Sequence, residues 1–91
     1  MNKKRRMIIA SLSVSIDRVK TEIDELLQPC TDVQEEEQEA FDNLSEGLQA
    51  SERGQVIEAA AGSLQEAADA IQAASDSLDE AIAALGEATG Q

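Results

Sequence analysis

The chain has 91 residues, enough for one domain, and it contains one Phe, no Trp and no Tyr. Fifteen of its apolar residues are alanine, so a hydrophobic core built from this chain alone is thin. With no His and a single Cys, the sequence excludes an internal disulfide, the ordinary zinc sites and catalytic triads that need an imidazole. Small chains without such supports often depend on oligomerisation, so we expect this chain to associate.

The net charge of −12 is distributed unevenly along the chain. Residues 1–20 contain six basic residues and one acidic residue, a net charge of +5, whereas residues 21–91 contain 18 acidic residues and only Arg53, a net charge of −17. This division favours contact of the N-terminal end with phosphates, and contact of the remaining chain with a basic protein surface.

A first helical pattern begins near Lys3. Its large apolar residues recur at spacings of three and four, which predicts a helix with one apolar stripe. The stripe comprises Ile9, Leu12, Ile16, Val19, Ile23 and Leu26. Pro29 interrupts this arm although Cys30 and Val33 keep its register, so we expect a kink there, or alternatively a new helix start capped by Thr31 or Asp32.

Turn-favouring residues accumulate between Asn43 and Gly54 and predict a hinge, with Ser51 as a cap of the next helix. Beyond it, large apolar residues fall seven apart and alanine follows each of them by three, which predicts a long heptad helix with alanine at one of its two core positions. The large residues are Ile57, Leu64, Ile71, Leu78 and Leu85, and the alanines are Ala60, Ala67, Ala74, Ala81 and Ala88.

These patterns predict an all-α fold, an antiparallel two-helix coiled-coil hairpin with an Ala-rich second helix. We expect a single domain over 1–91, with a first arm at about 3–44, a hinge at about 45–54 and a second arm at about 54–86. Roughly the first ten residues would overhang the second arm, leaving Met7, Ile8 and Ile9 without an intramolecular partner. The second arm has more small residues than one seam uses, which predicts assembly into a four-helix or larger bundle.

Acidic side chains are the first candidate site, a face that binds a partner protein. The candidate residues are Glu35, Glu36, Glu37, Glu39, Asp42, Asp69, Asp76, Asp79 and Glu80. Carboxylates three and four apart share a helix face and suit a divalent cation, but the sequence has no calcium-loop spacing and no Glu-x-x-His pair. We therefore expect no metal site, and a solvated face in its place.

Basic side chains at the N-terminal end are the alternative candidate site, which would bind an anion. These residues are Lys3, Lys4, Arg5, Arg6, Arg18 and Lys20. The negative charge of the remaining chain repels a long duplex and no aromatic residue is available to stack on bases, so a short ligand or a ribonucleoprotein suits this end better. Cys30 lacks a histidine to activate it and is expected to fill space in the core. We expect no catalytic residue, no cofactor and no enzymatic activity.

The hinge carries a resemblance to known proteins. Glu39, Ala40, Phe41, Asp42, Asn43 and Leu44, then Leu48, Gln49, Ala50, Ser51, Glu52, Arg53 and Gly54, followed by the acidic heptads, resemble small acidic helical proteins of phages and prophages of Gram-positive bacteria. The similarity covers about the second half of the chain, and Ser45 stands where that set has a proline. The family has no agreed activity to carry over.

The resemblance implies a phage protein that acts in the cytoplasm of the infected bacterial host by occupying a host protein. The first hypothesis is an anti-defence inhibitor whose acidic rod mimics the charge of nucleic acid on a basic surface. The second is an oligomeric bundle that captures a nucleotide signal or nucleic acid at its basic N-terminal end, and the third is a structural phage protein. We expect a homo-oligomer, a dimer or higher, and no membrane span, because Ser11, Ser13 and Ser15 break the short apolar run near the N-terminus.

Overall fold

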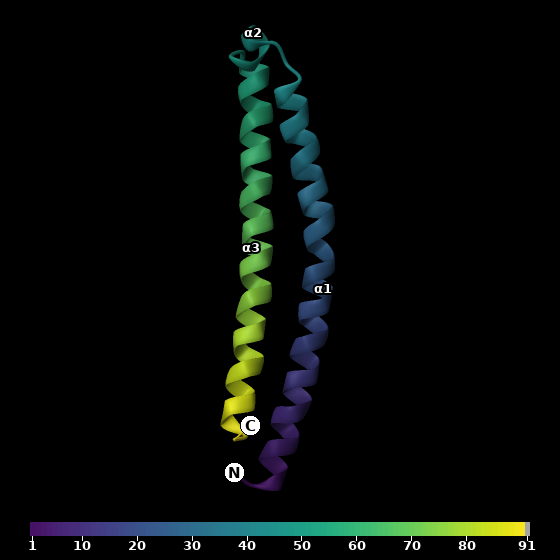
Figure 1. Cartoon of the computed structure of the whole chain (residues 1–91), viewed down its shortest axis with the longest axis vertical. Coiled ribbons are helices and arrows are strands. Elements are labelled where there is room, and N and C mark those ends of the chain that lie inside the picture. The colour runs from purple at the N-terminus through teal and green to yellow at the C-terminus, as the bar shows by residue number, and fades with distance from the viewer. Residues whose placement is uncertain (91) are drawn as a thin grey trace.

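A computed structural model of the chain, described here for residues 1–90, is a helical hairpin (Figure 1). It is 68 Å long and 16 Å wide in both directions perpendicular to its long axis. Helix α1 spans Lys3–Asp42, the short α2 spans Glu46–Gln49 and α3 spans Glu52–Ala88. Helices α1 and α3 run antiparallel along the length of the rod, and α2 lies in the connection at one end. Residues 1–90 contain no strand, so the predicted all-α hairpin is confirmed.

Each helix begins at a polar capping residue in extended conformation. The Asn2 side chain accepts a hydrogen bond from the Arg5 amide, and Ser51 accepts one from the Gly54 amide at 3.2 Å. These side chains satisfy amides that have no partner within the helix. The predicted cap at Ser51 is therefore confirmed.

Pro29 lies inside α1, which continues through it from Lys3 to Asp42 without a break. A proline at this position removes one backbone donor and crowds the carbonyl of the preceding turn. The helix tolerates this cost because the packed face on either side of Pro29 holds the two halves of α1 against the same partner helix. The alternative, a new helix start at Thr31 or Asp32, does not occur.

The seam between the helices differs from the predicted one in half of its positions. Half-buried positions of α1 alternate by four and three residues, and they are Ile9, Ser13, Ile16, Lys20, Ile23, Leu27, Cys30, Gln34, Glu37 and Phe41, with Thr31 also half-buried beside Cys30. The buried and half-buried seam positions of α3 are Gly54, Ile57, Ala61, Leu64, Ala68, Ile71, Ser75, Leu78, Ile82 and Leu85, and Ala60, Ala81 and Gly86 beside them are also half-buried. One predicted row of each helix is therefore correct, and the second row lies one residue later than predicted.

The shift has a physical reason in the side chains that it brings together. Ala61 and Ala68 are 1% and 7% exposed, and their small side chains let the helices approach closely at these points. The same rotation places Ser75 beside Asp24 and Lys20 beside Asp79. A heptad count weights apolar size and therefore selects the row of Leu12 and Val19, whereas these contacts across the seam favour the neighbouring row.

At the hinge, α2 packs against the start of α3. Gly54 is buried, and a Cβ atom at this position would collide with the carbonyl oxygens of Leu48 and Gln49. The Gln49 side-chain amide donates to the Phe41 carbonyl oxygen at 3.1 Å, which ties the hinge to the end of α1. A residue without a side chain at position 54 is what permits the close turn.

The N-terminal end is less isolated than the predicted overhang. Ile9 is half-buried and lines a cleft with Leu85, so its expected isolation is wrong. Met7 lines the same cleft although it is 64% exposed, so it too is less isolated than predicted, whereas Ile8 is 52% exposed and does not line the cleft. Among residues 1–90, none of the helices has an apolar stretch that would cross a membrane.

Candidate interaction surfaces

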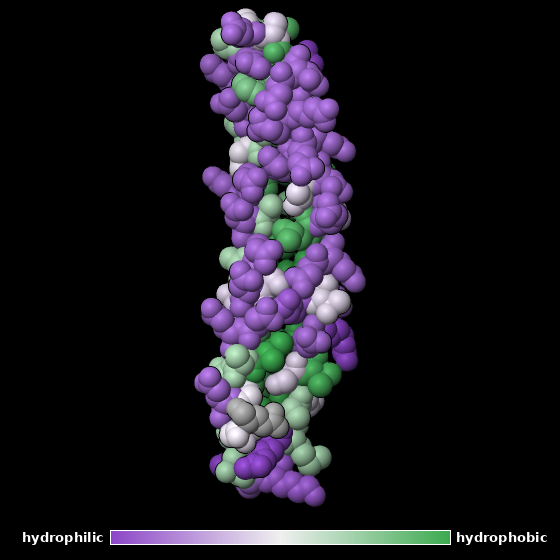
Figure 2. Space-filling view, viewed as in Figure 1, coloured by the Kyte–Doolittle hydropathy of each residue, from purple (hydrophilic) through white to green (hydrophobic). Residues whose placement is uncertain are grey.

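The predicted acidic site residues fall into two groups that the structure keeps apart. Glu35, Glu36, Glu37, Glu39 and Asp42 lie in the last turns of α1, beside the hinge, whereas Asp69, Asp76, Asp79 and Glu80 lie further along α3. Most of them are exposed, and Glu37 is half-buried at the seam. Figure 2 shows one face of the rod, on which hydrophilic side chains predominate and hydrophobic ones follow the line between the helices.

Several carboxylates are held by a glutamine one helical turn earlier. Gln65 donates to Asp69 at 3.0 Å, Gln72 donates to Asp76 at 3.1 Å, and Gln38 donates to Asp42 at 3.0 Å. These neutral donors orient the carboxylates without neutralising their charge. The glutamines therefore bring no positive charge to these three aspartates, whereas Asp79 of the same acidic set lies 3.6 Å from the Lys20 Nζ.

Lys20 is the basic side chain drawn into the seam. Its Nζ lies 2.9 Å from Asp24 and 3.6 Å from Asp79, and the pKa of Lys20 is raised, chiefly by its hydrogen bond to Asp24. The pKa of Asp24 is lowered, chiefly by the hydrogen bond from Ser75 and then by that from Lys20. Lys20 therefore takes part in the contact between the helices. This position does not favour its predicted role in an anion site.

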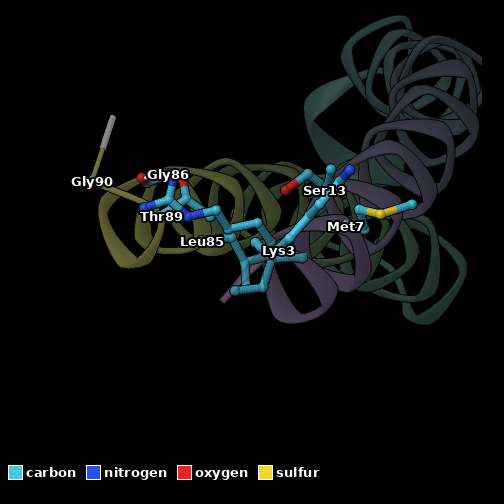
Figure 3. Close-up of a pocket in the computed structure, with 10 residues that line it drawn as sticks. Lys3, Met7, Ser13, Leu85, Gly86, Thr89 and Gly90 are labelled. Atoms are coloured by element: carbon cyan, nitrogen blue, oxygen red, sulfur yellow. Dashed lines mark hydrogen bonds between the residues drawn. The ribbon is translucent and has the colours of Figure 1, made fainter. Parts of the chain in front are cut away.

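Four of the other basic candidates, Lys3 to Arg6, lie at the start of α1, whereas Arg18 is exposed further along the helix. Lys3 and Arg6 line a cleft of about 620 Å³ together with Leu85, Gly86, Thr89 and Gly90 at the end of α3 (Figure 3). The carbonyl groups at the C-terminal end of a helix carry partial negative charge, so α3 attracts these two cations. At the amino end of α1, the four cations from Lys3 to Arg6 are unfavourable, because that end carries partial positive charge.

A row of large apolar side chains on α1 remains exposed. Leu12, Val19, Leu26 and Val33 are 47%, 46%, 58% and 46% exposed, and they fall seven residues apart on one side of the helix. The sequence pattern identified this row but placed its first three members in the hairpin seam. The structure leaves it beside the seam as an apolar stripe over about three heptads.

Helix α3 continues this stripe on the same side of the hairpin. On α3 the predicted alanine row stands one residue before a seam row, as Leu12 and Val19 do on α1. The contacts of Lys20 with Asp79 and of Asp24 with Ser75 lie on one side of the seam. In an antiparallel pair these two preceding rows face the same way. We call them the apolar face, which comprises Leu12, Val19, Leu26 and Val33 with Ala60, Ala67, Ala74, Ala81 and Ala88.

The row of α3 next to the apolar face is also free of charge. It contains Ser63, Ala70, Ser77 and Ala84, all exposed, whereas the acidic residues of α3 occupy the remaining positions. On α1 the corresponding row contains Ser15, Glu22, Pro29 and Glu36. The apolar face is thus bordered by few charges, in a chain that is 29% charged.

The residues described contain no candidate metal cluster, and Cys30 lies between the helices. Within residues 1–90 no three carboxylates and thiols are grouped so as to hold a metal ion. Cys30 is half-buried, and its Sγ lies 3.8 Å from the Leu64 carbonyl oxygen across the seam, where it fills space between the helices.

A scan against protein-family models, a search of curated proteins and a search of solved structures found no match to this chain.

Proposed function

We propose that this protein is a non-enzymatic binding protein, a phage-type inhibitor whose acidic rod occupies a basic, nucleic-acid-binding surface of a host protein in the bacterial cytoplasm. The observation that supports this most is the exposed and largely unneutralised acidic surface, with 18 acidic residues and only Arg53 in residues 21–91. Charge complementarity of this kind speeds encounter with a basic groove and selects for it.

The dimensions of the rod suit a charge mimic. A net charge of −12 along 68 Å is about one charge per 6 Å, roughly a third of the linear charge density of duplex DNA. Two hairpins side by side double this value. The proposed active form is therefore a four-helix bundle of two hairpins, which also covers the apolar face.

The test is capture of a host protein from bacterial lysate, followed by competition with duplex DNA. The captured protein should be released by DNA, and its affinity should fall about tenfold or more when Asp69→Asn, Asp76→Asn and Glu80→Gln are combined. These residues lie away from the seam and the apolar face, so folding and assembly stay intact. Binding that DNA does not compete, or that survives the triple change, contradicts the proposal.

The second candidate function is anion binding at the basic end, favoured by the cleft that Lys3 and Arg6 line. A phosphate there meets the carbonyl end of α3, which repels it, so the first candidate has the stronger physical support. Titration with inorganic phosphate and with a short oligonucleotide tests the second. Changing Lys3, Lys4, Arg5 and Arg6 to Ala should abolish such binding and leave capture by the acidic surface unchanged.

A further inference from the structure

We infer that the apolar face is the contact between two copies of this chain, and that the copies pack antiparallel, each basic end lying against the acidic end of α1 in the other copy. This rests on the self-association in the proposed function and adds the surface, the orientation and the residues that set it. The second copy is favoured over another partner by the match between the two ends of the chain's own α1.

The area available is sufficient for a stable dimer. A standard interface buries about 800 Å² on each partner, and the hairpin presents a side 68 Å long and 16 Å wide. Leu12, Val19 and Leu26 would be covered together with the small side chains of α3. Alanine and serine let the backbones of the two hairpins approach closely, as in tightly packed bundles.

The charges of α1 oppose its own helix dipole at both ends. Four cations occupy the first turn, and the last turns carry Glu35, Glu36, Glu37, Glu39 and Asp42 with no basic residue in the last turn. Each cluster is destabilising where it stands, because the amino end of a helix favours anions and the carboxyl end favours cations. An antiparallel second copy places each cluster beside the opposite one and offsets this cost.

The opposite orientation fails on the same charges. A parallel dimer gathers eight cations at one end and the acidic ends of two α1 helices at the other. In the antiparallel dimer, pairing about the middle of the stripe sets Arg5 opposite residue 40 of the second copy, within about one helical turn of Glu36. Both residues lie on the side of α1 that carries Leu12 and Val19. Arg5 is seven residues before Leu12, and Glu36 is three residues after Val33.

Two matched aspartate substitutions test the surface. Val19→Asp on the apolar face should weaken dimerisation on the order of 100-fold, measured by sedimentation equilibrium, because two buried charges would be created at the interface. Val14→Asp, at another exposed valine on the far side of α1, should leave it unchanged. Circular dichroism checks that both variants keep their helix content. Equal effects of the two substitutions would overturn the assignment of the surface.

Cysteine cross-linking tests the orientation, after Cys30→Ala has removed the native thiol. Glu22 lies near the middle of the stripe on the same side as Val19 and Leu26, so a two-fold axis across the rod brings Glu22 of one copy near Glu22 of the other. Glu22→Cys should oxidise rapidly to a covalent dimer, and Glu25→Cys, on the outer side, should not. A dimer in which both variants oxidise equally fast overturns the antiparallel contact.

A charge exchange supplies a second readout of orientation. Arg5→Glu should weaken the dimer about fivefold at low salt, and adding Glu36→Arg in the same chain should restore it, because the two residues meet across copies. Absence of rescue overturns the pairing. A monomeric mass in solution overturns both this inference and the bundle of the proposed function, whereas a dimer that fails only the cross-linking and rescue overturns the orientation alone.

Discussion

Ser75 of α3, only 2% exposed, donates its hydroxyl hydrogen to the carboxylate of Asp24 on α1. Lys20, one turn before Asp24, holds the same carboxylate and reaches Asp79 of α3. A hydroxyl buried at a helix contact needs a partner, and Asp24 supplies it in the observed register. The pair therefore fixes how the two helices slide and rotate against each other.

The pKa of Asp24 is lowered by Ser75 and then by Lys20, so its contribution to the free energy of unfolding has a definite pH dependence. Because the pKa of Asp24 is lower in the folded state, its carboxylate stabilises the hairpin at pH values above the ordinary pKa of 3.8. This contribution is lost as the pH falls through the folded-state pKa. Asp24→Asn should destabilise the hairpin at pH 7, and the difference from wild type should shrink below pH 4. Urea unfolding followed by circular dichroism at pH 7 and at pH 3 measures both values.

The control for this prediction is the wild type itself. Its free energy of unfolding is measured at both pH values, so that only its difference from Asp24→Asn is compared. Lys20, whose pKa is raised, behaves in the opposite sense, since its contribution is present at neutral pH and is lost as the pH rises above 10.5. A constant Asp24→Asn difference between pH 7 and pH 3 would contradict the assignment.

The hairpin and one row of each seam were predictable, because apolar residues at spacings of three and four specify one helix face. Ile16 and Ile23 on α1, with Ile57 and Leu64 on α3, face the seam as predicted. The second row was not predictable from apolar size. Lys20 and Ser75 are poor core residues by hydropathy, and the hydrogen bond and ion pair that place them there join residues 51 and 59 positions apart.

The buried alanine row gives a second prediction. Ala61 is 1% exposed, so Ala61→Leu forces the helices apart and should lower the free energy of unfolding by about 1–3 kcal/mol. Ala59→Leu, two residues earlier on the exposed side, should change it by less than about 0.5 kcal/mol. Equal effects of the two substitutions would indicate that the sequence-predicted seam, rather than the observed one, is occupied.

The candidate surfaces were predictable as sets of charges but not as positions. The sequence lists the acids, yet the hairpin separates Glu35 from Asp76 along the rod and draws Lys20 into the seam. The apolar face was hidden for a different reason. By spacing alone, Leu12 and Val19 fit the heptad of the seam as well as Ser13 and Lys20 do. Only the rotation of the helices reveals that Leu12 and Val19 are exposed.

Two glycines of α3 give a third, matched prediction. Gly54→Ala should destabilise the hairpin by about 1–3 kcal/mol, because the new Cβ would collide with backbone oxygens of Leu48 and Gln49 that do not move easily. Gly62→Ala has open space around the new methyl group and should stabilise by about 0.5–1 kcal/mol. Thermal unfolding at one protein concentration compares them, and stabilisation by both would show that the α2 contact is not formed.

Pro29 gives the last prediction, because it is the one residue inside α1 that lacks a backbone donor. Pro29→Ala restores the hydrogen bond to the Glu25 carbonyl and removes the crowding, so the free energy of unfolding should rise by about 1–3 kcal/mol. Gln28→Ala, at the neighbouring exposed position, is the control and should have a small effect. Since Pro29 borders the apolar face, the change is measured by urea unfolding and by sedimentation together. A loss of stability on Pro29→Ala would mean that the proline fits a bend on which packing against α3 depends.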